Sequence, residues 1–243
     1  MVCDRILVEP YSLPPLRYEY SALEPWIDEQ TMRLHHDHHH RRYVQALNET
    51  EARLAAVRTS GDHLLIQSLQ QRAASLASAH YLHRLFWDSM GRYQGKPEGD
   101  LAAQISEDFG SLTALKFRFS AAAVGIELGG WVILAWQPLT QRLVCVVAEG
   151  NVLQADWAMA PLMALDVWEH AYYLKYQQRR AEYVHNWWNT VDWARVGVRF
   201  NGAVDDRQFP SRLGPSVRDH NGTRTPPAGF AAVAPPGHLM VVR

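Results

Sequence analysis

Histidine is the residue type with the most chemical potential in this 243-residue chain, which contains 12 of them beside nine tryptophans. Five of the six residues from 35 to 40 are histidines, and such a run alone is typical of a solvated polar face. On a helix, however, His35, His39 and Tyr43 recur every four residues and share one face with apolar neighbours. We predict that these three side chains face inward. The other histidines of the run are predicted at the surface: His36, His38 and His40.

Two further groups of residues could form a metal site together with these histidines. His83 lies on the apolar side of a second helical pattern, where a histidine is more often a hydrogen-bonded core residue than a ligand. In an antiparallel helical hairpin, though, it can come level with His35. Asp166 closes an apolar run and His170 follows four residues later, a pair that alone indicates a helix N-cap and a packing residue. Together the pieces offer three neutral imidazoles and one carboxylate, a donor set suited to manganese, iron or zinc.

Two long helices must carry the first two histidine positions. A helical pattern begins at the candidate N-cap Asp28, and after a break near residues 60–62 a second helix continues to about Met90. The short break implies an antiparallel hairpin. Residues 91–99 are rich in turn formers and polar groups, which indicates a linker.

Beyond the linker the pattern changes to short helices and strands. Helices are predicted at about 100–108 and 111–124, the second capped by Ser111. Residues rich in β-branched and aromatic side chains predict strands at 131–136, 142–148 and 160–166, followed by a helical section. The predicted class is therefore α+β, with a small three-stranded antiparallel sheet flanked by helices. The predicted domains are a leader at 1–12, the helical hairpin at 13–95, an α/β metal-binding domain at 96–200 and a disordered, proline-rich tail at 201–243.

Composition narrows the class of protein. Twenty-four basic and 25 acidic side chains give a net charge of −1, which argues against nucleic acid as a partner. Cys3 and Cys145 are far apart and form no CxxC pair, so neither a disulfide framework nor a thiolate zinc site is expected. The first residues lack the pattern of a signal peptide, and no run approaches the roughly 18 apolar residues of a membrane span. We expect a cytoplasmic protein with no membrane partner.

Four sequence blocks carry a resemblance to a known family. They are HHDHHHRRYV, HYLHRLFW, FGSLTALKFRFSAAAVG with GGW, and DVWEHAYYLKY, which occur in unbroken order. With them, residues 13–200 resemble the iron/manganese superoxide dismutase family. The resemblance implies conversion of superoxide to dioxygen and hydrogen peroxide by alternating reduction and oxidation of bound manganese or iron. It also implies the metal ligands: His35, His83, Asp166 and His170.

The resemblance further implies roles around those ligands. His39 and Tyr43 would form a gate at the mouth of the site, with Trp131 and Trp168 as its aromatic walls. Arg180 stands at the position of the family's funnel arginine. Two residues would reach the partner subunit of a homodimer or higher homo-oligomer, where one contacts a ligand histidine and the other the gate histidine: Glu169 and Tyr173.

The sequence departs from the family at one polar position. A glutamine or histidine of the family hydrogen-bonds solvent at the metal, either four residues before the second ligand, where this chain has Ala79, or from the loop after the second strand. Glu149, Asn151 or Gln154 could substitute. The departure leaves open a dismutase-fold protein that binds metal but has a structural or other redox role, and a zinc hydrolase is a third alternative. His80 and the HRLFW block favour manganese over iron.

Overall fold

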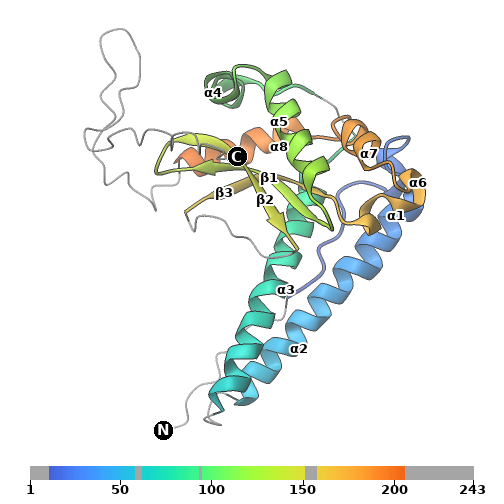
Figure 1. Ribbon diagram of the computed structural model, residues 1–243, viewed down its shortest axis with the longest axis vertical. Coiled ribbons are helices and arrows are strands. Elements are labelled where there is room, and N and C mark those ends of the chain that lie inside the picture. The colour runs from blue at the N-terminus through green and yellow to red at the C-terminus, as the bar shows by residue number, and fades with distance from the viewer. Residues whose placement is uncertain (1–10, 58–61, 93–94, 151–157, 206–243) are drawn as a thin grey trace, which may run out of the picture. The chain divides into compact units, whose positions relative to one another are not determined.

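The computed structural model describes residues 11–57, 62–92, 95–150 and 158–205, and its longest elements form a helical hairpin. Helices α2 (Arg41–Val57) and α3 (His63–Ser89) run antiparallel and lie side by side (Figure 1). Buried apolar residues on both helices, among them Leu47 and Leu69, pack in the hairpin. The predicted pair of antiparallel helices is confirmed.

The segment before α2 contains a change in helix type. Helix α1 (Glu29–Arg33) starts at Asp28, whose carboxylate accepts a hydrogen bond from the Thr31 N–H at 2.8 Å, as the predicted N-cap requires. The next seven residues, η2 (Leu34–His40), wind as a π-helix instead of continuing the α-helix. A π-helix bonds residue i to i+5 and so takes up about one extra residue per turn. Every side chain after Leu34 is therefore rotated relative to the uninterrupted helix that the sequence predicts.

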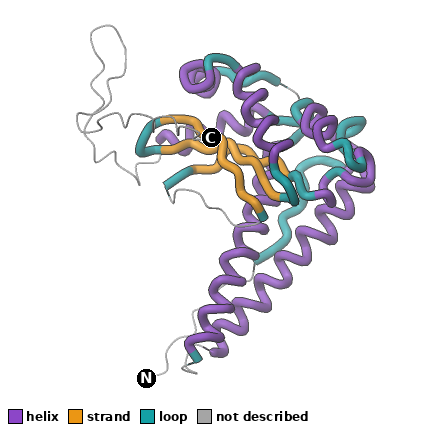
Figure 2. The backbone as a smooth tube through the Cα atoms, in the orientation of Figure 1, coloured by secondary structure: helices purple, strands orange, loops and turns teal. Residues whose placement is uncertain are grey.

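Three antiparallel strands form the sheet (Figure 2): β1 (Gly130–Gln137), β2 (Arg142–Glu149) and β3 (Ala160–Asp166), in the order β2-β1-β3. All eight residues of the central strand β1 are buried, because it has a neighbour on each edge and helices against its faces. Trp131 lies opposite Ala148 on one side and Asp166 on the other. The register thus brings the end of β3 next to a buried tryptophan.

Short helices surround the sheet. Ser111 caps α5 (Leu112–Gly125) by accepting a hydrogen bond from the Ala114 N–H at 3.1 Å, as predicted. Phe119 of α5 stacks on Trp187 of α7 (Arg180–Trp187), with ring centroids 5.7 Å apart. The remaining helices are η1 (Tyr20–Leu23), α4 (Gly99–Phe109), η3 (Glu169–Ala171), α6 (Tyr173–Tyr176) and α8 (Trp193–Asp205). The predicted α+β class is confirmed.

The outer edge of β3 is tied to the helical hairpin. Ser89, at the end of α3, accepts a hydrogen bond from the Ala164 N–H at 3.2 Å and donates one to the Leu85 carbonyl. Arg199 of α8 donates to the Leu162 carbonyl at 2.6 Å. These bonds satisfy polar backbone groups that the sheet itself leaves unpaired. They hold α3 and β3, which carry two of the candidate ligands, in a fixed relation.

Some predicted boundaries meet the limits of the described residues. Helix α8 continues to Asp205 and so includes the first five residues of the predicted tail, 201–205, because Phe200 is buried in the core and keeps the helix packed. The rest of the predicted tail, most of the predicted leader and part of the predicted linker lie outside the described residues. Within the described part of the chain, no helix combines the length and apolar character needed to cross a membrane.

Candidate metal centre

Four side chains from four elements meet where the hairpin packs on the sheet. They are His35 of η2, His83 of α3, Asp166 at the end of β3 and His170 of η3. One nitrogen or oxygen atom from each lies within 4.8 Å of the corresponding atoms of the others. The structure thus brings together all four residues that the sequence predicts as ligands.

The four converging atoms lack hydrogen-bond partners in the described part of the chain. Oδ2 of Asp166 lies 3.1 Å from His35 Nε2, 3.3 Å from His170 Nε2 and 3.9 Å from His83 Nε2. All four atoms are buried, and none makes a regular hydrogen bond there. Leaving a buried polar atom unpaired costs about 1–3 kcal/mol. A cation among these atoms would pair all of them at once, so the donor set fits a bound metal.

The protonation of these residues suits metal binding as well. Burial lowers the pKa of His35 to about 4 and that of His83 to about 3, so both imidazoles are neutral near pH 7. The Nδ1 of His83 donates a hydrogen bond to the Ala79 carbonyl at 2.7 Å, which leaves the Nε2 lone pair free. Burial alone raises the pKa of Asp166, but His170 and His35 outweigh it and hold that pKa below its ordinary value. The cluster therefore presents three imidazoles and one carboxylate.

Imidazole rings line up across the site. The ring of His39 stacks on His170 at 4.3 Å and 13°, and the ring of His40 stacks on His83 at 5.1 Å and 15°. His83 and His170 are themselves nearly parallel, at 10°. His35 stands across them, at 84° to His83 and 75° to His170. Two consecutive residues of the π turn thus each cover one candidate ligand.

The predicted gate and wall residues also lie at the cluster. His39 is exposed and contacts the site through its stack on His170, while the partly buried Tyr43 ring lies 5.3 Å from that of His83. Trp131 is fully buried, 4.9 Å from His83, and Trp168 runs parallel to His170 at 6.4 Å. Their position agrees with the predicted roles, and the roles themselves stay predictions.

Three histidines of the run do not lie where the sequence predicts. His36 and His40 were expected at the surface, yet both are buried, and His39 was expected to face inward, yet it is exposed; His38 is exposed as expected. The prediction counts four residues per repeat along an α-helix, whereas the π turn adds a residue and brings His40, five residues after His35, to the inward side. His36 is buried by partners outside its own turn, because it bonds to the Pro14 carbonyl at 2.9 Å as well as to Asp37 at 2.8 Å.

Sequence reasoning missed a polar network next to the ligands. The Trp87 Nε1 lies 3.1 Å from His40 Nδ1, and His40 Nε2 lies 2.7 Å from His80 Nδ1. In the sequence, Trp87 is only the last residue of the HYLHRLFW block, and His80 only favours manganese over iron. The one available signal was the buried side of α3, which carries His80, His83 and Trp87 at spacings of three and four.

The predicted interface residues are accessible. Tyr173 is 49% exposed, and Glu169 is exposed with no side-chain hydrogen bond or ion pair to the residues that the structure describes. The side chain of Arg180 is partly buried. Its guanidinium donates to the Tyr172 hydroxyl at 3.1 Å and to the carbonyls of Ile126 and Leu128, the latter at 3.3 Å. It holds the connection between α5 and β1, while its predicted role in the funnel is untested.

Of the three residues that could replace the family's missing amide, only Glu149 lies within the described residues. Glu149 is exposed at the end of β2 opposite Gly130, whereas its neighbour Ala148 is buried opposite Trp131. Because successive strand residues point to opposite faces, Glu149 points away from the face that holds Trp131. Asn151 and Gln154 lie outside the described residues. Ala79 is buried and has no polar side-chain atom to offer.

Comparison with known proteins places the chain in a family. The family model described as the iron/manganese superoxide dismutase C-terminal domain matches residues 97–199, and the alpha-hairpin domain model matches residues 10–91. A probable superoxide dismutase (Fe) of Bacillus subtilis is 44% identical over 194 residues, which cover 79% of this chain and 69% of the relative. A superoxide dismutase (Mn/Fe) of Propionibacterium freudenreichii is 40% identical over 79% of this chain and 98% of its own.

A third relative has a similar name. A superoxide dismutase (Fe) of Pyrobaculum aerophilum is 39% identical over 82% of this chain and 96% of the relative. The two domain models together match most of the hairpin and of the sheet domain, including all four elements that carry the candidate ligands. The chain belongs to the iron/manganese superoxide dismutase family.

Proposed function

We propose that this protein is a superoxide dismutase that holds manganese, or else iron, between His35, His83, Asp166 and His170. The observation that carries the proposal is the convergence of four buried, unpaired ligand atoms from elements of both halves of the chain. A manganese or iron ion there would take one electron from one superoxide and return it to a second. With two protons taken up, the products are one dioxygen and one hydrogen peroxide.

The chain's own residues supply the surroundings that this reaction needs. The neutral imidazoles and the single carboxylate keep the buried charge low. Trp131 and Trp168 exclude bulk water from two sides of the cluster. The Tyr43 hydroxyl is a proton donor or acceptor at the side of His83, and we assign it to positioning substrate and moving a proton.

The proposal includes a choice between manganese and iron. Three imidazole nitrogens and a carboxylate oxygen suit manganese and iron alike, and the relatives named above include both kinds. We favour manganese on His80 and the block around it. Purification from cells supplied with either metal, followed by metal analysis and activity per bound ion, tests this choice.

We further propose a homodimer, or a higher homo-oligomer built from it, in which Glu169 and Tyr173 contact the partner subunit. Both are exposed close to the site, Glu169 next to His170 in the chain and Tyr173 at the start of α6. His39, stacked on His170, is exposed too, so the gate region would lie at or near the contact.

A direct assay tests the function. Metal-quantified protein is mixed with superoxide in a stopped-flow instrument, and decay is expected to be first order in bound manganese or iron. Tyr43→Phe is expected to keep full metal content while lowering turnover or changing its pH profile. Stoichiometric metal with superoxide decaying at the uncatalysed rate would favour the second candidate, a metal-binding dismutase-fold protein with another role. The apolar Ala79 beside the site is the observation that keeps this candidate open.

A further inference from the structure

The strongest unassigned feature is the buried network Trp87–His40–His80, which fixes the protonation of His40. An indole nitrogen can only donate, so the Trp87 N–H must donate to the lone pair of His40 Nδ1. A neutral imidazole with its lone pair on Nδ1 carries its proton on Nε2. That N–H points at His80 Nδ1, 2.7 Å away, which must then accept. Burial, which lowers the pKa of His40 to about 2, agrees with the neutral form.

His40 transmits this fixed orientation to a candidate ligand. Its ring stacks on that of His83 at 5.1 Å and 15°. His83 is hydrogen-bonded at Nδ1 to the Ala79 carbonyl, a single bond about which the imidazole can still tilt, and the rings of Tyr43 and Trp131 lie on its other sides. The Nε2 lone pair lies in the ring plane, so the tilt of the ring decides where the lone pair points. The neighbouring ring of His40 limits that tilt.

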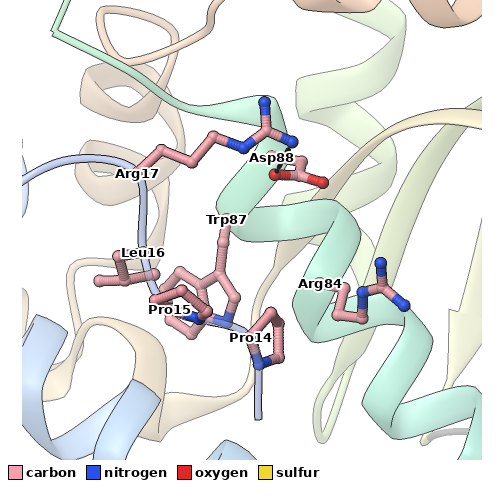
Figure 3. Close-up of a pocket in the computed structure, with 7 residues that line it drawn as sticks. All are labelled: Pro14, Pro15, Leu16, Arg17, Arg84, Trp87 and Asp88. Atoms are coloured by element: carbon pink, nitrogen blue, oxygen red, sulfur yellow. Dashed lines mark ion pairs between the residues drawn. The ribbon is translucent and has the colours of Figure 1, made fainter. Parts of the chain in front are cut away.

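The Trp87–His40–His80 network also contacts a second candidate ligand, His35. Trp87 packs edge-on against His35, with ring centroids 4.7 Å apart. On another side the indole lines a pocket together with Pro14, Pro15 and Leu16 of the N-terminal segment, as Figure 3 shows. Arg17 of this segment pairs with Asp88 at 2.9 Å. The tryptophan thus lies between the N-terminal segment and the site.

We propose that His40 is a positioning residue that fixes the plane of His83 and that His80 and Trp87 hold it in place. The inference rests on the proposed function, because it takes His83 as a metal ligand. His80 is the residue to change, since its ring contacts are with Tyr11 and His40 and not with any of the four ligands. A substitution there reaches His83 through His40.

The test compares two substitutions of His80, with Co²⁺ as the probe. His80→Asn places an amide oxygen where Nδ1 was and keeps the acceptor, whereas His80→Leu removes it and leaves the His40 N–H unpaired. We expect His80→Leu to bind Co²⁺ about tenfold more weakly and to shift its visible ligand-field bands. His80→Asn should stay within about twofold of wild type with an unshifted spectrum. The exposed His38, on the same turn as His40, supplies the control His38→Gln.

The outcomes separate this inference from the proposed function. Wild-type protein that binds no stoichiometric Co²⁺ contradicts the ligand set itself. Wild type that binds Co²⁺, with a folded His80→Leu identical in affinity and spectrum, overturns the role of His40 alone. Should His80→Leu not fold, nitrogen NMR of wild-type protein loaded with diamagnetic Zn²⁺ decides: a proton on His40 Nε2 supports the network, and one on Nδ1 refutes it.

Discussion

At the scale of single residues, Asp166 divides its two carboxylate oxygens between two tasks. Oδ1 accepts a hydrogen bond from the Trp168 N–H at 2.9 Å, and Oδ2 points into the cluster of imidazoles. The backbone carbonyl of Asp166 accepts the Tyr183 hydroxyl at 3.0 Å. Held by these two hydrogen bonds, this residue already has the orientation that a ligand needs before a metal arrives.

Removing one candidate ligand should remove the metal. We expect His83→Ala and Asp166→Ala each to lose stoichiometric manganese or iron, because three remaining donors cannot hold an exchangeable ion in a closed cavity. Metal analysis of the purified variants measures this, with His38→Ala as an exposed control from the same histidine run. Full metal content and unchanged spectra in either ligand variant would falsify the assignment.

The buried histidines predict an acid-sensitive metal-free protein. His35 and His83 take up protons near pH 6.5 when unfolded, but only near pH 4 and 3 when folded. The unfolded chain therefore binds more protons below pH 6.5, and stability falls as the pH drops from 6.5 to 4, by up to about 1.4 kcal/mol per pH unit for each residue. Asp166 is ionised in both states across most of this window and adds its loss below it.

Urea unfolding of the metal-free protein at pH 7, 6, 5 and 4.5 measures this dependence. The free energy of unfolding should decrease steadily over the series, and saturating metal at pH 7 should raise it, because a ligand that binds the folded state alone stabilises that state. A free energy of unfolding that is flat from pH 7 to 4.5 would show that these histidines are not buried in their neutral form.

At the scale of elements, the connection between α5 and β1 determines the position of Trp168 beside the site. Gly129 lies against the face of Trp168, and a Cβ atom at this position would come within 2.4 Å of the indole. Arg180 holds the same connection through the Ile126 and Leu128 carbonyls. The tryptophan wall can therefore lie flat beside His170 only because residue 129 has no side chain.

Substituting Gly129 in this connection should be costly, whereas substituting Gly125, the last residue of α5, should not. Gly129→Ala should displace Trp168 and lower the free energy of unfolding by about 1–3 kcal/mol, since the added methyl group overpacks a rigid ring. Gly125→Ala meets no atom within 4 Å and should change stability by under about 1 kcal/mol. Urea denaturation and tryptophan fluorescence of both variants provide the comparison. Equal stabilities would contradict the close approach at residue 129.

Elements whose causes are local could be predicted from the sequence, and the π turn could not. The caps at Asp28 and Ser111 depend on a side chain and a backbone N–H three residues away, so the sequence contains both partners. The π turn is held by bonds to residues far earlier in the chain, from His36 to the Pro14 carbonyl and from Tyr20 to Asp37. Its effect on the histidine faces appears only in three dimensions.

The residues of the candidate site likewise include some that could be predicted from the sequence and some that could not. His35, His83, Asp166 and His170 were predicted because ligand chemistry needs those residue types, and matching blocks fix their order. His40 was missed because its burial depends on the π turn and on partners 40 and 47 residues away, His80 and Trp87. Spacing along one helix carries no information about such partners.

At the scale of the whole molecule, the predicted dimer can be tested through Glu169. We expect Glu169→Ala to weaken the dimer by about 2–5 kcal/mol, because a buried charge-assisted hydrogen bond to the partner would lose one member. Glu182→Ala, which removes only a surface ion pair with Arg179, is the matched control. Sedimentation equilibrium measures both. A wild-type protein that remains monomeric at micromolar concentration, with its metal bound, would rule the dimer out.

Two truncations test where the folded part of the chain ends. Ending the chain after Asp205 should leave metal content and thermal midpoint nearly unchanged, since the residues beyond it include six prolines and no apolar periodicity. Ending it after Arg195 removes the buried Val196 and Phe200, the latter packed edge-on against Trp136 at 5.4 Å. That loss should cost at least about 3–5 kcal/mol. Release of metal by the shorter deletion would contradict this prediction.

The π turn also makes the effect of a deletion depend on where in the segment it falls, apart from the identity of the residue lost. Deleting one codon between His35 and His39 would let the segment return to an ordinary α-helix, because the extra residue of the π turn would be gone. His39, His40 and Tyr43 would then keep about the direction they have now, whereas the same deletion inside α2 would rotate every later residue of that helix by about 100°. A scan of single substitutions, however complete, cannot reveal such a dependence, whereas a library of single-codon deletions would detect it immediately.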